Sequence, residues 1–114
     1  MANIVVQVNQ NGTEYYQRIL RNMINLKKQL GDSLIQCEIV VFGDGMNLLI
    51  TKDDEIKEQI QVLIELGFEF IACRNTLSKK KLNVEQMVCS VGSAGSGVAH
   101  LVTRQMEGWA YLAL

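Results

Sequence analysis

The feature that most constrains the fold is an alternation of short apolar runs with segments whose apolar residues recur every three or four positions. The runs Ile4–Val6 and Ile39–Val41 contain only β-branched residues, which is typical of strands buried on both faces of a parallel sheet. Ile56, Ile60 and Leu63 instead follow the period of a helix. Strands that alternate with helices favour a parallel sheet with helices on both faces and right-handed crossovers.

The whole chain can be divided in this way. The expected strands are residues 3–8, 36–42, 68–73, 87–91 and 109–114. The expected helices are residues 14–30, 55–66, 77–82 and 98–107, with a short helical turn at residues 46–50. Glycines at positions 31, 67 and 108 follow three of these helices and are expected to end them.

Helix starts and inner faces follow from local patterns. The candidate N-terminal caps are Asn11 with Glu14, Asp53 or Asp54, and Asn75 with Thr76. The predicted inner faces are Tyr16, Leu20, Met23, Ile24 and Leu30 in the first helix, Ile56, Ile60, Leu63 and Ile64 in the second, and Val98, Val102 and Met106 in the last. On another face of the last helix lie His100, Arg104 and Glu107.

Composition limits the function. A chain of 114 residues suffices for one domain with a single core, which we take to span residues 1–114. The formal net charge of -1 predicts no bulk attraction to nucleic acid or to an anionic membrane. No apolar run approaches the roughly 18 residues of a membrane span, and the N-terminus shows no signal-peptide core. Three widely spaced cysteines favour neither disulfides nor a metal site, and indicate a reducing cytoplasm.

Cys73 is the strongest candidate for chemistry. It lies where the expected strand at 68–73 meets the following helix, at the carboxyl edge where parallel sheets bind ligands. Backbone N–H groups at a helix start favour a thiolate, but the helix terminus alone lowers a thiol pKa by only about one unit. A buried cysteine that merely fills space fits the position equally well. Cys37 lies inside a strand and is expected to be such a core residue.

Four loops should gather at this edge, namely residues 9–12, 43–45, 73–76 and 92–97. Small residues before a helix can cradle an anion through their N–H groups, or can simply form a tight connection. An alternative function is therefore a binding module for a small anion or nucleotide, without covalent chemistry. The predicted supporting residues around Cys73 are Arg74, Asn75, Thr76, Asn9, Gly43, Gly45, Ser93, Gly95, Ser96 and Gly97.

Several motifs together resemble a known family. They are the element Phe70–Leu77, the segment Ser96–Val102, the segment Gln105–Tyr111, the start Val5–Asn9 and the turn Phe42–Gly45. In this combination they resemble the DsrE/DsrF-like family over nearly the whole chain, as a small stand-alone member with the YchN-like fold.

The resemblance implies a three-layer α/β/α fold with a five-stranded parallel sheet, flavodoxin-like in its general layout. It also implies homotrimers or larger rings such as hexamers. Family members of sulfur relays pass sulfur as a cysteine persulfide, and Cys73 matches that cysteine by its place after the third strand. The sequence therefore predicts a sulfur-transfer or sulfur-carrier protein with protein donors and acceptors and no cofactor or metal.

An excess of apolar residues also favours a homo-oligomer. Met46, Leu48, Leu49 and Ile50 are clustered beside the expected site, and Trp109, Tyr111 and Leu112 lie in the last strand. We expect a subunit boundary near Cys73, with a neighbour's residues 46–50 forming part of its wall. The alternative is that these residues simply cover the sheet within one subunit.

Overall fold

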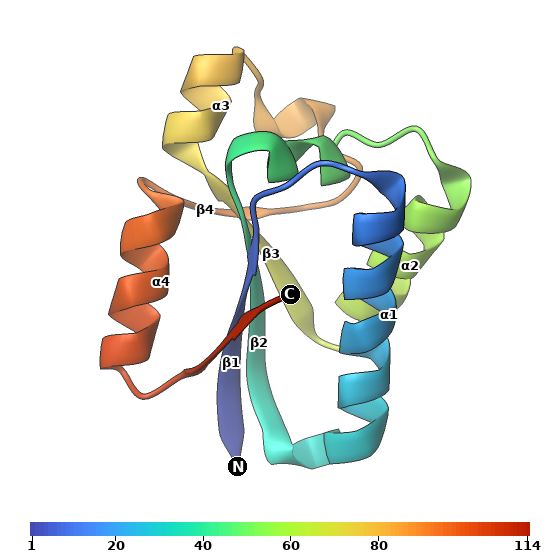
Figure 1. Ribbon diagram of the computed structural model, residues 1–114, viewed down its shortest axis with the longest axis vertical. Coiled ribbons are helices and arrows are strands. Elements are labelled where there is room, and N and C mark those ends of the chain that lie inside the picture. Colours follow the sequence, from blue (N-terminus) through green and yellow to red (C-terminus); the bar gives the residue numbers. More distant parts are fainter.

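The computed structural model describes residues 1–114 as one parallel sheet between helices (Figure 1). The strands are β1 (Ala2–Val8), β2 (Leu34–Val41), β3 (Phe68–Cys73), β4 (Gly92–Ala94) and β5 (Ala110–Ala113). The helices are α1 (Thr13–Leu30), α2 (Asp54–Glu65), α3 (Arg74–Lys80) and α4 (Gly97–Met106), with short 3₁₀ turns η1 (Gly31–Ser33), η2 (Gly43–Leu48) and η3 (Val84–Gln86). The five strands run in the order β4-β3-β2-β1-β5, all parallel. The predicted fold class is confirmed.

The two faces of the sheet are covered very differently. Alternate residues of a strand point to opposite faces, so Ile4, Val6 and Val8 meet α1 and α2 in a core of 22 buried residues. On the other face, Val5 contributes to a core of only five residues, which includes Leu101 of α4. In Figure 1, α1 and α2 lie on one side of the sheet and α4 lies on the other. No helix has both the length and the apolar content needed to cross a membrane.

Helix starts depart from expectation at two places. Asp53 caps α2 as predicted, since its Oδ1 accepts the N–H of Ile56 at 3.1 Å. Helix α1 instead begins after Gly12 without a side-chain cap, and Asn11 accepts the hydroxyl of Tyr16. Helix α3 begins directly after Cys73 rather than after a polar cap. The predicted capping box and the predicted caps before residue 77 are therefore wrong.

The fourth strand lies later in the chain than predicted. Residues 87–91 form no strand, because the backbone N–H of Val88 donates to the carbonyl of Leu49 at 2.8 Å and the segment packs over the larger core. The glycine-serine segment Gly92–Ala94 pairs with Ile71–Cys73 in its place. The pairing brings the following loop directly beside Cys73.

Helix α4 is rotated relative to the prediction. Its predicted inner stripe faces outward, with Val98, Val102 and Met106 exposed by 57%, 51% and 81%. Leu101 is buried, and His100 and Arg104 turn toward the sheet. In α1, Leu30 of the predicted inner face is likewise exposed. Ile19, which the predicted inner face did not include, is fully buried.

The segment expected at a subunit boundary is part of the core. Met46, Leu48 and Leu49 have no exposed surface and pack in the cluster beneath α1 and α2. The apolar side chains of Met46, Leu48 and Leu49 are therefore covered within the subunit, and half-buried Ile50 is the apolar residue of this segment that a neighbour could contact.

Replacing Gly45 with alanine should destabilise the fold. A Cβ there would lie 2.3 Å from the carbonyl oxygen of Val8, so the backbone of η2 or β1 would have to move. We expect Gly45→Ala to lower the free energy of unfolding in urea by about 1–3 kcal/mol. Gly95→Ala is the control, since its Cβ would only touch the flexible end of Arg74 at 3.4 Å. Equal stability of the two variants would contradict the close packing.

Candidate functional site

Cys73 is the last residue of β3 and precedes the first turn of α3. Its predicted position at the strand–helix junction is confirmed. Only 4% of the residue is exposed. Three other parts of the chain meet around it: the η2 turn, the loop after β4 and the N-terminus of α4.

The first turn of α4 supplies a donor to the sulfur. The backbone N–H of Gly97 donates to Cys73 Sγ across 3.3 Å. Glycine is required for this approach, because a Cβ at position 97 would lie 2.9 Å from the ring of Phe42 at the end of β2. Ser96 caps the helix by accepting the N–H of Ala99 at 3.2 Å. The N–H of Gly97 is thus free of helix bonding and faces the thiol.

Thr76 connects the thiol to the η2 turn. Its Oγ1 accepts the N–H of Gly43 at 2.9 Å, which leaves its own hydroxyl hydrogen for the sulfur. The N–H of Asn75 donates to the carbonyl of Gly95 at 3.2 Å. These bonds join three loops, which are far apart in the sequence, around one sulfur atom.

The surroundings distinguish Cys73 from the other two cysteines. Burial raises the pKa of the Cys73 thiol, but hydrogen bonds from Thr76, Gly97 and Asn75 outweigh it and hold the pKa below its ordinary value. Burial raises the pKa of Cys37, and it also raises the pKa of Cys89. At neutral pH, Cys73 therefore carries the largest thiolate fraction.

The remaining predicted site residues lie in two positions. Arg74 is exposed at the rim, where its Nη1 donates to Ser93 Oγ at 3.3 Å beside Gly95. Gly45 lies within η2 and packs its backbone against that of Val8 and Asn9, and neither Asn9 nor Gly45 donates a hydrogen bond to the sulfur. The structure thus brings Arg74, Asn75, Thr76, Gly43 and Gly95–Gly97 to Cys73, and leaves Asn9 and Gly45 as support.

Few loop donors remain for an anion. The N–H of Gly43 donates to Thr76 Oγ1, that of Gly45 donates to the carbonyl of Phe42, and that of Gly97 donates to Cys73 Sγ. Ser93 is part of β4 rather than of a free loop. The anion-binding alternative rested on residues 43–45 and 92–97, and three of their N–H groups already have protein partners.

Sequence reasoning missed the residues that hold α4. Glu38 of β2 is buried and accepts bonds from His100 and Arg104. A glutamate within the otherwise apolar segment 37–41, together with two cationic residue types at i and i+4, was the available signal.

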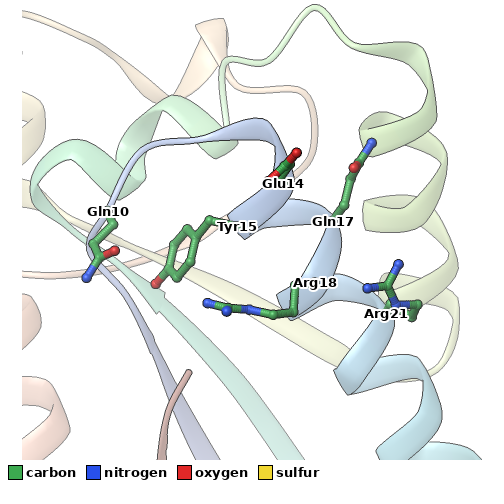
Figure 2. A pocket seen from close by; sticks show the side chains of 6 residues that line it. All are labelled: Gln10, Glu14, Tyr15, Gln17, Arg18 and Arg21. Carbon is green, nitrogen blue, oxygen red and sulfur yellow. The ribbon is translucent and has the colours of Figure 1, made fainter.

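The largest hollow of the surface, about 520 Å³, lies elsewhere. In Figure 2, Tyr15 and Arg18 extend from α1 on the side where Gln10 lies, while Arg21 lies farther along the helix. The guanidinium of Arg18 lies 5.6 Å from the ring centroid of Tyr15. No residue of the Cys73 site lines this hollow, so the concave surface and the reactive thiol do not coincide.

The fold and site define a three-layer α/β domain with a thiol at the carboxyl end of an inner strand. A family model described as DsrE/DsrF-like family matches residues 2–114, and the chain belongs to this family. The resemblance inferred from the motifs is thereby confirmed. No curated protein matches the chain.

Solved structures share the fold over the full chain. MTH1491 from Methanobacterium thermoautotrophicum, a protein of unknown function, is 30% identical with a TM-score of 0.89, and all of both chains are covered. The ychN protein from E. coli is 16% identical with a TM-score of 0.80, again with all of both chains covered. BT1422 from Bacteroides thetaiotaomicron, also of unknown function, is 11% identical with a TM-score of 0.75, covering 98% of this chain and 94% of its own.

Cys73 should react with iodoacetamide at lower pH than Cys37 and Cys89, because hydrogen bonds stabilise only its thiolate. Thr76→Val should raise the pH midpoint of Cys73 alkylation by about one unit, since a hydrogen bond to a charged group contributes about 1.5–3 kcal/mol and the N–H donors remain. Thr76→Ser keeps the hydroxyl and is the control. Rates are measured by peptide mapping across a pH series, and equal midpoints for the three cysteines would contradict the assignment.

Proposed function

We propose that this protein carries or transfers sulfur as a persulfide on Cys73. The observation that carries the proposal is the hydrogen bond from Gly97 N–H to Cys73 Sγ at 3.3 Å, supplemented by Thr76. These donors stabilise negative charge on one sulfur atom, and the other cysteines lack them. Membership in the DsrE/DsrF-like family supports the same chemistry.

The reaction needs no oxidant, metal or cofactor. The Cys73 thiolate attacks the outer sulfur of a donor persulfide, a new S–S bond forms, and the donor sulfur–sulfur bond breaks with its electron pair leaving on the donor thiolate. In the second step an acceptor thiolate attacks the outer sulfur held on Cys73. That S–S bond breaks, and Cys73 is released as the thiolate that began the cycle. The donor and the acceptor are proteins or small thiols of a reducing cytoplasm.

Access to the thiol requires local movement. Cys73 is 4% exposed, whereas Arg74 and Gly95 beside it are exposed. The loop of Gly95 and Ser96 is anchored at the site by the bond from Asn75 N–H to Gly95 and by the Ser96 cap. We assign donor entry to this side, because breaking the bond at Gly95 would leave the pairing of β4 with β3 intact.

Incubation with glutathione persulfide should add one sulfur atom to Cys73, because its thiolate fraction exceeds that of Cys37 and Cys89. Intact mass spectrometry with peptide mapping measures the adduct. Cys73→Ser should abolish it, while Cys89→Ser, which removes a thiol outside the donor cluster, should leave it unchanged. Absence of the adduct, or equal labelling of the three cysteines, would exclude a carrier role for Cys73.

We also propose that the chain assembles with copies of itself, as a trimer or a hexamer. Val98, Val102 and Met106 form an exposed apolar stripe along α4, beginning next to Gly97. Strand β5 is an open edge of the sheet, and Tyr111 and Leu114 are exposed there. A second copy covering these features would bring the subunit boundary close to Cys73 and bury surface that a small monomer leaves in water.

The double variant Val102→Glu with Met106→Glu should lower the oligomer mass, because burying two carboxylates at an apolar contact is unfavourable. Size-exclusion chromatography with light scattering at micromolar concentration measures the mass. Val62→Glu is the control, since Val62 is 40% exposed on α2, across the sheet from α4. A monomer mass for the unmodified protein would end the proposal.

A further inference from the structure

Glu38 is the one charged residue among the buried residues, with 6% of its surface exposed. It lies in the middle of β2 on the face covered by α4. Its Oε1 lies 2.7 Å from Nε2 of His100 and accepts Nε of Arg104 at 2.9 Å. Its Oε2 accepts Nη2 of the same guanidinium at 2.9 Å. Arg104 thus binds the carboxylate with two parallel bonds, the strongest geometry available to an ion pair.

Arg104 makes further contacts outside the buried pair with Glu38. Its Nη1 donates to Glu107 at 2.9 Å, and its guanidinium carbon lies 4.4 Å from the centroid of the Trp109 ring. The backbone N–H of Trp109 donates to the carbonyl of Arg104 at 3.0 Å. The C-terminal half of α4 and the start of β5 are therefore organised around the same cation.

This polar cluster holds α4 where apolar packing is sparse. The core on this face has five residues, and Leu101 is the one large apolar side chain of α4 in it. The outward stripe of α4 contributes nothing to this contact. The bonds from His100 and Arg104 to Glu38 are consequently a main attachment of α4 to the sheet.

The contacts of His100 and Arg104 with Glu38 lie close to the first turn of α4, which contacts the thiol. His100 is one turn along α4 from Gly97, whose N–H reaches Cys73 Sγ. Phe42, against which Gly97 packs, directly follows β2 and lies four residues after Glu38. The polar contact of His100 and Arg104 with Glu38 and the steric contact of Gly97 with Phe42 therefore both determine how closely the first turn of α4 approaches the sheet.

We propose that Glu38, acting through His100 and Arg104, is a positioning residue that keeps the N–H of Gly97 within hydrogen-bonding distance of the Cys73 thiolate. As a role in sulfur transfer this inference rests on the proposed function. Glu38 itself touches neither the sulfur nor any substrate.

The decisive variant is Glu38→Gln, which keeps the side-chain volume but loses the charge and one acceptor oxygen. Its amide donates where Arg104 also donates, so the paired bonds cannot both form. We expect the amide of Gly97 to exchange with deuterium at least about tenfold faster, because the first turn of α4 opens more often. The pH midpoint of Cys73 alkylation should rise by about half a unit to one unit, since the bonds from Thr76 remain.

Two controls separate positioning from general instability. Glu107→Gln removes the exposed contact of the same arginine and should leave both readouts unchanged. Leu63→Ala makes a cavity in the larger core on the opposite face, so it should reduce global stability without shifting the Cys73 midpoint. If Glu38→Gln fails to fold, Arg104→Lys replaces it, since lysine keeps the charge but cannot form the paired bonds.

The inference is overturned if Glu38→Gln, or Arg104→Lys in its place, leaves both the Gly97 exchange rate and the Cys73 midpoint unchanged. It is equally overturned if Leu63→Ala shifts the midpoint as much. Because alkylation and exchange need no sulfur donor, a shifted midpoint in a protein that accepts no sulfur would refute the proposed function alone. A normal sulfur adduct with no shift in Glu38→Gln would refute the positioning role alone.

Discussion

The contact between the first turn of α4 and the end of β2 is the constraint on which the site depends. Gly97 packs against Phe42 so closely that a Cβ would lie 2.9 Å from the ring, and only at this depth does its N–H reach Cys73 Sγ at 3.3 Å. The same approach places the loop after β4 over α3, where Gly95 accepts the N–H of Asn75. The lowered pKa of the Cys73 thiol therefore depends on Thr76 and Asn75 of α3, and also on the packing that brings Gly97 to the sulfur.

The cores on the two faces of the sheet differ in size, and this difference explains why α4 is attached by polar contacts. The face beneath α1 and α2 buries 22 residues and provides most of the apolar stabilisation, so β2 and β3 are held rigidly in place. The face beneath α4 buries five, and its attachment relies on the carboxylate of Glu38. Apolar contacts are non-directional, whereas a paired guanidinium–carboxylate contact fixes both distance and orientation. A helix that must present one N–H at a defined position is suited to the second kind of attachment.

The sequence predicts the fold and the place of Cys73 because both depend on local patterns. Continuous β-branched runs such as residues 39–41 indicate buried parallel strands, and Cys73 ends a short aromatic and apolar strand at a helix start. The orientation of α4 could not be predicted in this way. Val98, Val102 and Met106 have ideal helical spacing, but the choice of inner face was decided by Glu38, some sixty residues earlier. An interaction between distant residues outweighed the helix's own periodicity.

The fourth strand shows the same limit. Residues 87–91 have the composition of a strand, but their apolar side chains cover the larger core while Gly92–Ala94 pair with β3. Glycine and serine have low strand propensity, so the pairing depends on the neighbouring strand rather than on local preference. The loop residues Gly95 and Gly97 were assigned to the site from their position alone, and the pairing of β4 explains how they arrive there.

A lowered pKa of the Cys73 thiol is compatible with the carrier role that we propose. Below the thiol pKa, lowering it by one unit raises the thiolate fraction roughly tenfold but reduces intrinsic nucleophilicity about threefold, so the net gain in attack rate is about threefold. The same stabilisation makes Cys73 a better leaving group when an acceptor attacks the outer sulfur of its persulfide. Burial raises the pKa of Cys73 and hydrogen bonds lower it, with a net lowering. If Cys73 both accepts and releases sulfur, as we propose, these opposing effects are favourable, because extreme stabilisation of the thiolate would slow the first step.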